Sequence, residues 1–218
     1  SGIGTGQLPD KEGQMYYMPE DDLYLIPTAE VPLTNIYRDI LLPTNDFSIK
    51  MTGYTPCFRR EAGSYGKDVR GLNRLHQFDK VEIVRIEHPS NSAQALEEMV
   101  AHVKGLLEKL GLQYRILRLC GGDMGFASAM TYDFEVYSAA QEKWLEVSSV
   151  SRFDTFQSNR LKLRFKDEEK KSQLCHTLNG SALALPRIVA AMLENHQTAD
   201  GIKIPEALKS YTGFDLIA

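Results

Sequence analysis

The sequence predicts an α+β fold in which helices flank an antiparallel β-sheet. Segments in which apolar and polar residues alternate, the period of a strand, recur along the chain. Only residues 92–110 and 182–196 have the length of long helices, and the first of these carries apolar residues at three- and four-residue spacing. Strands therefore outnumber helices, and the long helices stand at two places, which fits an α+β architecture.

Composition favours one globular domain. A chain of 218 residues, 43% of them hydrophobic, can bury a sizeable core. A net charge of −4 and a pI of about 5.8 argue against a protein that coats nucleic acid through charge alone. Cys57, Cys120 and Cys175 are far apart, which argues against structural zinc and fits a reducing cytoplasm. No signal peptide and no apolar run of roughly 20 residues is present, so we expect a cytoplasmic protein with no membrane partner.

The first elements are expected to be short. Residues 1–22 are rich in Gly, Pro, Asp and Glu and predict a loop. Residues 23–26 predict a short buried strand that ends at Pro27. A helix-like segment over residues 31–40 follows, and Thr28 could serve as its N-cap.

The stretch from Cys57 to Glu82 predicts a strand, a long turn and a second strand. Glycines at 63, 66 and 71 punctuate the middle of it. Lys67, Arg70 and Arg74 in this loop suit a polyanion, because arginine forks match phosphate oxygens bidentately. The residues alone therefore predict a nucleotide-phosphate site.

The second half predicts more strands and a final helix. Residues 114–120 form one strand, and residues 131–137 and 144–149 form a hairpin. In its second strand Glu146 and Ser148 share one face, and a bulge could bring Ser149 round to it. Residues 160–166 alternate strictly, which predicts a strand with a basic face that is either solvated or turned toward phosphate or tRNA.

The last part of the chain predicts a strand, a helix and an irregular tail. Residues 174–181 predict a strand that enters a tight turn at Asn179 and Gly180. The helix over residues 182–196 tolerates Pro186 in its first turn. Residues 199–213 predict an irregular tail anchored by Tyr211 and Phe214.

Three motifs in order point to one family. The stretch from Cys57 to Glu82 closely resembles motif 2 of class II aminoacyl-tRNA synthetases, in the form found in seryl-tRNA synthetases. Residues 26–30 agree with the same family, and residues 176–181 running on to Arg187 resemble its motif 3. The resemblance covers about residues 4–213. It implies that residues 1–218 form a catalytic domain that lacks motif 1, the dimer-interface segment, and the N-terminal tRNA-binding helical arm.

The resemblance implies that the protein activates serine with ATP and Mg²⁺ and passes it to the 3′ end of tRNA(Ser), as a homodimer when full-length. Such a reaction needs cations converging on phosphates and an acid for the serine ammonium. The arginines expected to act in catalysis are Arg59, Arg74 and Arg187. The residues expected at serine are Thr28, Glu30, Arg59, Glu82, Asn179 and Ser181. Those expected at ATP are Arg59, Glu61, Arg74, Phe78, Glu146, Ser149 and Arg187, with Glu146 and Ser149 also contacting Mg²⁺.

Several alternatives stay open. Phe78 could be a core residue and Arg59 a surface arginine, whereas His76 is expected to be structural, because the reaction needs no base. Arg152 stands where the family usually has asparagine. A relative that loads an amino acid onto a carrier protein, holding its substrate through zinc, is one rival function. A non-catalytic paralogue used as a binding module is another, although it should have lost the arginines and acids named above.

Overall fold

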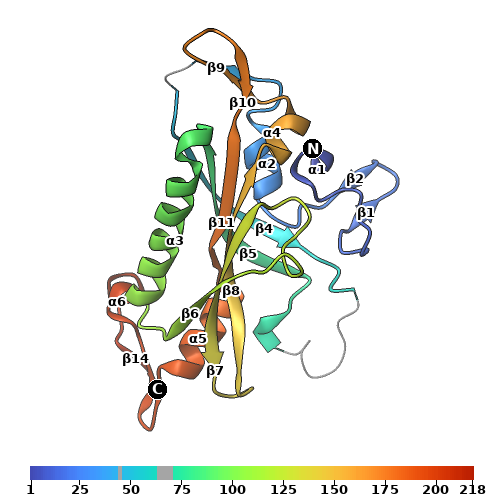
Figure 1. Cartoon of the computed structure of the whole chain (residues 1–218). Coiled ribbons are helices and arrows are strands. Elements are labelled where there is room, and N and C mark those ends of the chain that lie inside the picture. Colours follow the sequence, from blue (N-terminus) through green and yellow to red (C-terminus); the bar gives the residue numbers. More distant parts are fainter. Residues whose placement is uncertain (44–45, 63–70) are drawn as a thin grey trace.

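The computed structural model describes residues 1–43, 46–62 and 71–218 (Figure 1). Its helices and 3-10 turns are α1 (Gly2–Thr5), α2 (Glu30–Asn35), η2 (Gly71–Asn73), η3 (Pro89–Asn91), α3 (Ser92–Lys109), α4 (Phe156–Leu161), α5 (Leu185–Asn195) and α6 (Glu206–Thr212). Its strands are β1 (Tyr17–Met18), β2 (Leu23–Tyr24), β3 (Leu41–Leu42), β4 (Ile49–Phe58), β5 (Gln77–Glu87), β6 (Tyr114–Arg118), β7 (Met130–Ser138), β8 (Lys143–Asp154), β9 (Arg164–Lys166), β10 (Ser172–Leu174), β11 (His176–Ala184), β12 (Gln197–Thr198), β13 (Gly201–Lys203) and β14 (Leu216–Ile217). The α+β prediction is confirmed. The loop residues Gly63, Gly66, Lys67 and Arg70 lie outside the described ranges.

An antiparallel sheet in the order β4-β5-β11-β8-β7-β6 forms the centre of the molecule (Figure 1). The predicted hairpin is confirmed, because β4 pairs with β5 from Ile49 opposite Ile86 to Phe58 opposite Gln77. Strand β11 lies between β5 and β8, and its register with β5 shifts between Ser181 and Ala184. Leu178 is buried in the apolar core, whereas Thr177 is buried on the opposite face. The sheet thus separates an apolar face from a polar one.

Helices α3 and α5 cover the apolar face. The predicted stripe on α3 is confirmed: Leu96, Met99, Val103 and Leu107 are buried and pack with Phe134 of the sheet. Burial of each such side chain stabilises the fold by about 1.5–3 kcal/mol. Gly111 ends the helix with a φ of 66°, a left-handed conformation that glycine adopts without a steric penalty.

The polar face is covered only at one end. Helices α1, α2 and α4 cluster there with the N-terminus (Figure 1). A second apolar cluster, which includes Leu161 and Phe165, packs beside Leu42 and Ile86 under the small sheet β10-β9-β3. The rest of the polar face is left open, and this is where the candidate site lies.

The prediction of a tight turn at Asn179 and Gly180 is wrong. Both residues continue inside β11, opposite Val84 and Ile83 of β5. Glycine is required there by close packing, not by turn geometry. A Cβ at position 180 would lie 2.8 Å from Val150 Cγ2.

Three other expectations are also wrong. Arg160 and Leu161 end helix α4, and Lys162 caps it in the left-handed region, so only Arg164–Lys166 is a strand. The buried strand expected at 23–26 is the exposed two-residue strand β2. The tail contains α6 and the sheet β12-β13-β14, and Tyr211 is 86% exposed, so it anchors nothing in this chain. In each case tertiary packing decided what a short pattern could not.

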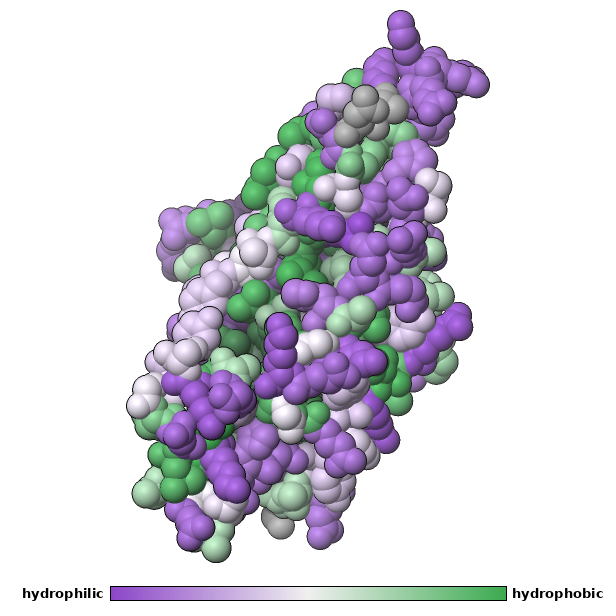
Figure 2. Space-filling model, turned by 90° about the vertical axis from the view of Figure 1, so that its left-hand side faces the viewer, coloured by the Kyte–Doolittle hydropathy of each residue, from purple (hydrophilic) through white to green (hydrophobic). Residues whose placement is uncertain are grey.

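One face of the molecule is mostly hydrophilic (Figure 2). Seen from the side on which α3 lies in Figure 1, polar residues dominate and apolar residues form only a broken band (Figure 2). On α3 this surface includes Gln94, Glu97, Glu98 and Lys104. Among the described residues, no helix has both the length and the apolar composition to cross a membrane.

The packing at Gly180 gives a stability prediction. We expect Gly180→Ala to lower the free energy of unfolding by about 1–3 kcal/mol, because the new methyl group overlaps Val150 and the backbone of Ser149 in the sheet. Urea denaturation of wild type and variant measures this loss.

Gly105 offers a matched control, because it lies inside α3 and a Cβ there would have no neighbour within 4 Å. Gly105→Ala should raise the stability by about 0.5–1 kcal/mol, since glycine is the poorer helix former. If both variants lost the same free energy of unfolding, the close contacts at position 180 would not be the cause of the loss in Gly180→Ala.

Candidate functional site

A cleft composed of two overlapping cavities lies on the open polar face of the sheet. The larger cavity has a volume of about 930 Å³ and the smaller one about 260 Å³. The two share Arg59, Glu61, Arg74, Lys80, Glu146 and Ser181, so they form one continuous space. Every residue that the sequence assigned to serine, ATP or metal lines one of them or both, including Thr28, Glu30, Phe78, Glu82, Ser149, Asn179 and Arg187. The structure therefore brings together all the predicted side chains, which come from distant parts of the chain.

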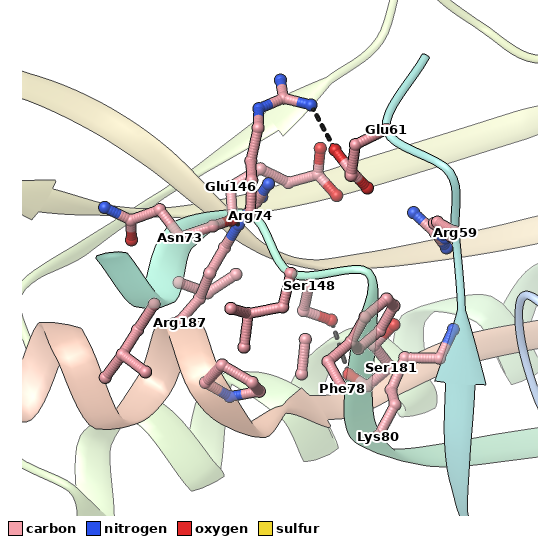
Figure 3. Close-up of a pocket in the computed structure, with 15 residues that line it drawn as sticks. Arg59, Glu61, Asn73, Arg74, Phe78, Lys80, Glu146, Ser148, Ser181 and Arg187 are labelled. Carbon is pink, nitrogen blue, oxygen red and sulfur yellow. Dashed lines mark hydrogen bonds and ion pairs between the residues drawn. The ribbon is translucent and has the colours of Figure 1, made fainter. Parts of the chain in front are cut away.

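Three arginines reach the cleft from three different elements (Figure 3). Arg59 directly follows β4, Arg74 directly follows η2, and Arg187 lies in the first turn of α5. Arg187 donates from Nε to the Asn73 carbonyl at 2.9 Å and from one Nη to the Glu146 carbonyl at 2.5 Å. Both acceptors are uncharged backbone carbonyl oxygens. The two hydrogen bonds therefore fix the position of the Arg187 guanidinium without neutralising its positive charge.

The electrostatics of Arg187 show how closely the cations converge. Burial lowers the pKa of Arg187, the neighbouring Glu146 raises it, and Arg74 and Arg59 lower it further. Arg74 also forms an ion pair with Glu61 at 2.9 Å between Nη and Oε2. Such a concentration of positive charge, partly enclosed, favours an anionic ligand.

An aromatic ring flanks the arginines. Phe78 lies on β5 opposite Cys57, and the Arg59 guanidinium lies over its ring at 5.4 Å from the centroid. Phe78 is half-buried and lines the smaller cavity. A flat apolar surface beside cations suits a planar, anionic ligand such as a nucleotide.

A buried polar group closes the inner end of the cleft. Lys80 Nζ lies 2.6 Å from a Glu82 carboxylate oxygen and donates to Thr28 Oγ1 at 2.8 Å. Thr28 Oγ1 in turn donates to Glu82 at 3.4 Å and accepts from the Glu30 backbone N–H at 3.2 Å. Thr28 is therefore not the N-cap of α2, a position that Ala29 occupies, and its side chain lines the larger cavity. The three side chains are at most 7% exposed.

Lys80 is a site residue that the sequence prediction missed. Alternation along β5 puts Phe78, Lys80 and Glu82 on the same face, so the signal was present in the strand period. Asn73 was missed as well. It supplies a backbone carbonyl to Arg187, and no sequence pattern marks such a contact.

Glu30 lies beside this group in an environment that disfavours its charge. Burial raises the pKa of Glu30 to about 7, and the nearby Glu82 carboxylate contributes to the rise. Gln157 donates to one Glu30 oxygen at 2.7 Å and Gln7 to the other at 3.2 Å. The Asn179 amide offsets part of the rise in pKa, yet its nitrogen has no partner at hydrogen-bonding distance within the described ranges. This buried N–H group remains able to donate to a ligand.

A bulge is present in the second hairpin strand, but the prediction that Glu146 and Ser148 share one face is wrong. In the pairing of β7 with β8, Phe134 faces Ser148 and Glu135 faces Glu146, so Val147 is the extra residue. Glu146 and Ser149 consequently line the same cavity although three residues separate them. Glu146 is an exposed residue that lines the cleft. Desolvation raises its pKa, Asp133 raises it further, and Arg187 and Arg59 lower it.

Two residues singled out in the sequence lie outside the cleft. His76 lines neither of the two cavities, and its Nδ1 shares a hydrogen bond of 2.6 Å with the Tyr16 hydroxyl. Arg152 lines neither as well and forms an ion pair with Asp154 at 2.7 Å. The unusual arginine at position 152 therefore changes contacts beside the cleft and not within it.

Comparisons with known proteins agree with this geometry. A serine–tRNA ligase of Salinibacter ruber is 59% identical over 216 residues, which is 98% of this chain and 50% of that protein. The seryl-tRNA synthetase of Pyrococcus horikoshii complexed with ATP superposes with a TM-score of 0.94 at 40% identity, covering 99% of this chain and 48% of that one. A cytoplasmic serine–tRNA ligase of Naegleria fowleri in complex with AMP gives a TM-score of 0.91 at 28% identity, covering 98% and 52%.

The chain thus spans about half the length of the relatives it matches. The family model of the class II tRNA synthetase core domain (G, H, P, S and T) matches residues 16–196, a range that contains every predicted site residue. By this match the chain belongs to the class II tRNA synthetase core-domain family.

Proposed function

We propose that this chain is the catalytic domain of a serine–tRNA ligase, which activates serine with ATP and transfers it to the 3′ end of tRNA(Ser). The observation that carries the proposal is the convergence of Arg59, Arg74 and Arg187 on a cleft whose inner end holds a buried acid, Glu82. The high identity to serine–tRNA ligases supports the choice of serine. The ATP and AMP complexes of related proteins support the use of ATP.

Glu82 is proposed to hold the serine ammonium. Its carboxylate is paired with Lys80 and accepts from Thr28. The substrate ammonium would join this group and share the carboxylate. The unpartnered Asn179 amide and Ser181 line the same cavity and are available for the polar groups of serine. Serine would be preferred over alanine, because a buried donor or acceptor left without its hydroxyl partner is costly.

Activation requires little covalent chemistry from the protein. A serine carboxylate oxygen attacks the α-phosphorus, an O–P bond forms, and the bond to the β-phosphate breaks with release of pyrophosphate. Arg59, Arg74 and Arg187 bind the phosphates and offset the negative charge that develops on their oxygens. Phe78 and Glu61 line the smaller cavity, where Phe78 would offer its ring face to adenine and Glu61 would accept from the adenine amino group.

Mg²⁺ fits the oxygen donors at the bulge of β8. Glu146 and Ser149 supply a carboxylate and a hydroxyl to one cavity, and Asp133 lies close enough to raise the pKa of Glu146. Among the described residues no three His, Cys, Asp or Glu side chains are grouped to hold a metal by themselves. A cation here would share its coordination with water and phosphate, as Mg²⁺ does. When bound it would neutralise phosphate charge.

Transfer to tRNA follows from the same site. A hydroxyl of the terminal ribose attacks the serine carbonyl carbon, an ester bond forms, and the bond to AMP breaks. The departing phosphate takes up the hydroxyl proton. The proposal also includes a homodimer formed through a segment like motif 1 and a cytoplasmic location, both of which rest on the family resemblance.

The rival functions gain no specific support. A non-catalytic paralogue should have lost charged site residues, yet Arg59, Arg74, Arg187, Glu82 and Glu146 are all present and all line the cleft. A carrier-protein ligase with a zinc-held substrate would need a donor cluster at the inner end. The described residues there are threonine, lysine, glutamate, asparagine and serine.

The first test is serine-dependent ATP–pyrophosphate exchange by the intact protein. We expect Arg59→Ala and Arg187→Ala each to lower kcat/KM for exchange by roughly 10²–10³-fold, because each removes a cation from the developing phosphate charge. Steady-state exchange with serine, alanine and threonine measures both the loss and the amino-acid preference.

Two variants serve as controls for the exchange assay. His76→Gln and Arg118→Ala change residues that line neither of the two overlapping cavities, and we expect both to stay near the wild-type rate. Equal losses in all four variants would contradict the roles given to the arginines. Exchange that prefers another amino acid would contradict the assignment to serine.

The buried Glu30 gives a pH-dependent prediction for stability. Its pKa of about 7 in the folded protein exceeds the ordinary value of 4.5, so the folded state holds the proton more strongly than the unfolded chain. This contribution to stability is complete below pH 4.5 and is lost as the pH rises through 7. Glu30→Gln stays neutral and should gain about 2–3 kcal/mol relative to wild type between pH 5 and pH 8, from 1.36 kcal/mol per pKa unit.

Urea denaturation at several pH values measures this difference. Glu168→Gln, at an exposed residue of the 167–171 loop, is the matched control and is expected to follow the wild type. A difference between Glu30→Gln and wild type that stays constant from pH 5 to pH 8 would show that Glu30 does not titrate in this range.

A further inference from the structure

The larger cavity continues outward to a rim to which activation of serine assigns no role. Beyond the buried Thr28–Lys80–Glu82 group it is lined by residues 6–15 in part, by Phe126 from the loop between β6 and β7, and by Arg160 from α4. The smaller cavity is lined by Arg187 and Phe78 and by none of these rim residues. The rim therefore belongs to the larger cavity alone of the two.

Phe126 on the rim has an exposed aromatic ring that packs against the ring of Phe156. It is 74% exposed, and its ring meets that of Phe156 edge-to-face with centroids 5.6 Å apart. The Arg160 guanidinium lies over the Phe156 ring at 3.8 Å. Gly6, with a φ of 93°, lets the N-terminal segment pack against both rings, since a Cβ there would lie 3.2 Å from Phe156 and 3.7 Å from Phe126. We call Phe126, Phe156 and Arg160 the aromatic platform.

Charge alone does not identify the ligand of this rim. Arg160 and Lys11 are basic, but Asp10 and Glu12 line the same part of the cavity. Asp10 is already used, because its carboxylate accepts from the backbone N–H groups of Gln14 and Met15 at 3.0 and 2.8 Å. An exposed ring braced by a second ring and a guanidinium points instead to stacking of a flat group.

We infer that the aromatic platform stacks the 3′-terminal nucleobase of the tRNA and so positions its ribose hydroxyl for the transfer step. This inference rests on the proposed function. With ATP bound among the arginines, the acyl acceptor must approach the serine carbonyl from the side of the cavity that nucleotide and serine leave open. Phe126 lines the larger cavity together with Glu82 and Asn179 but does not line the smaller cavity with Arg187 and Phe78, and aromatic rings are the usual platforms for unpaired bases.

The test separates the two half-reactions in the intact protein. Single-turnover transfer from preformed seryl-adenylate to tRNA(Ser) should fall roughly 10–100-fold in Phe126→Ala and Phe126→Leu, the scale of one lost base–aromatic stack. Phe126→Trp keeps a stacking surface and should transfer within about threefold of wild type. Serine-dependent pyrophosphate exchange should be unchanged in all three variants, because Phe126 does not line the smaller cavity that holds Arg187 and Phe78.

Tyr211→Ala is the matched control, since Tyr211 is an 86% exposed ring that lines none of the cavities described. Transfer by Phe126→Leu at the wild-type rate with normal exchange would overturn the inference and leave the proposed function standing. Parallel loss of exchange and transfer would also overturn it, because Phe126 would then support the cavity as a whole. Absence of serine-dependent exchange in the wild type would instead overturn the proposed function.

Discussion

The site depends on holding three guanidinium groups close together without neutralising all of them. Like charges repel, and Arg74 and Arg59 both make the charged form of Arg187 less favourable. The structure tolerates this because the donors of Arg187 meet backbone carbonyls of Asn73 and Glu146, while Arg74 meets Glu61. Each arginine is fixed by an element that also packs in the fold. The residual positive charge is what an incoming triphosphate would relieve.

The sheet makes this arrangement possible because one of its faces packs in the apolar core and the other carries the polar side chains of the cleft. On β11, Leu178 joins the apolar core under α3, and its neighbours Thr177 and Asn179 are buried on the other side among polar groups. Burying polar side chains is costly unless they find partners, and Gln157 satisfies several of them at once. It accepts from Thr177 and donates to Glu30 and to the Thr5 carbonyl. The inner end of the cleft is thereby rigid before any ligand binds.

The two overlapping cavities of the cleft differ in their lining. Of these two, Arg187 and Phe78 line only the smaller, Glu82 and Phe126 line only the larger, and Arg59 and Arg74 line both. Under the proposed function, ATP would lie among the arginines and serine beside Glu82, so that the two reactants are held next to each other. When the substrates themselves supply the reacting groups, an enzyme accelerates the reaction mainly by holding them close together in the correct orientation.

Much of the fold and of the site followed from sequence. The period of β5 and the apolar stripe of α3 predicted long regular elements, because their own side chains must bury one face. The site residues were found where motifs fix residue types at set spacings, and the shared face of Phe78, Lys80 and Glu82 could have been read from the same period. The 160–166 segment and the tail were misjudged, since short alternating patterns fit a helix end as well as a strand.

By itself, then, the sequence determined which chemistry the chain can offer: the charged groups, their spacing, and the strands that carry them. Only the tertiary structure decided which groups meet. It placed Gly180 within a buried strand, turned Ser149 to the side of Glu146 through the bulge at Val147, and set Phe126 and Arg160 on the rim of one cavity. These outcomes depend on contacts between residues far apart in the chain, and no local pattern encodes the free energy of such contacts.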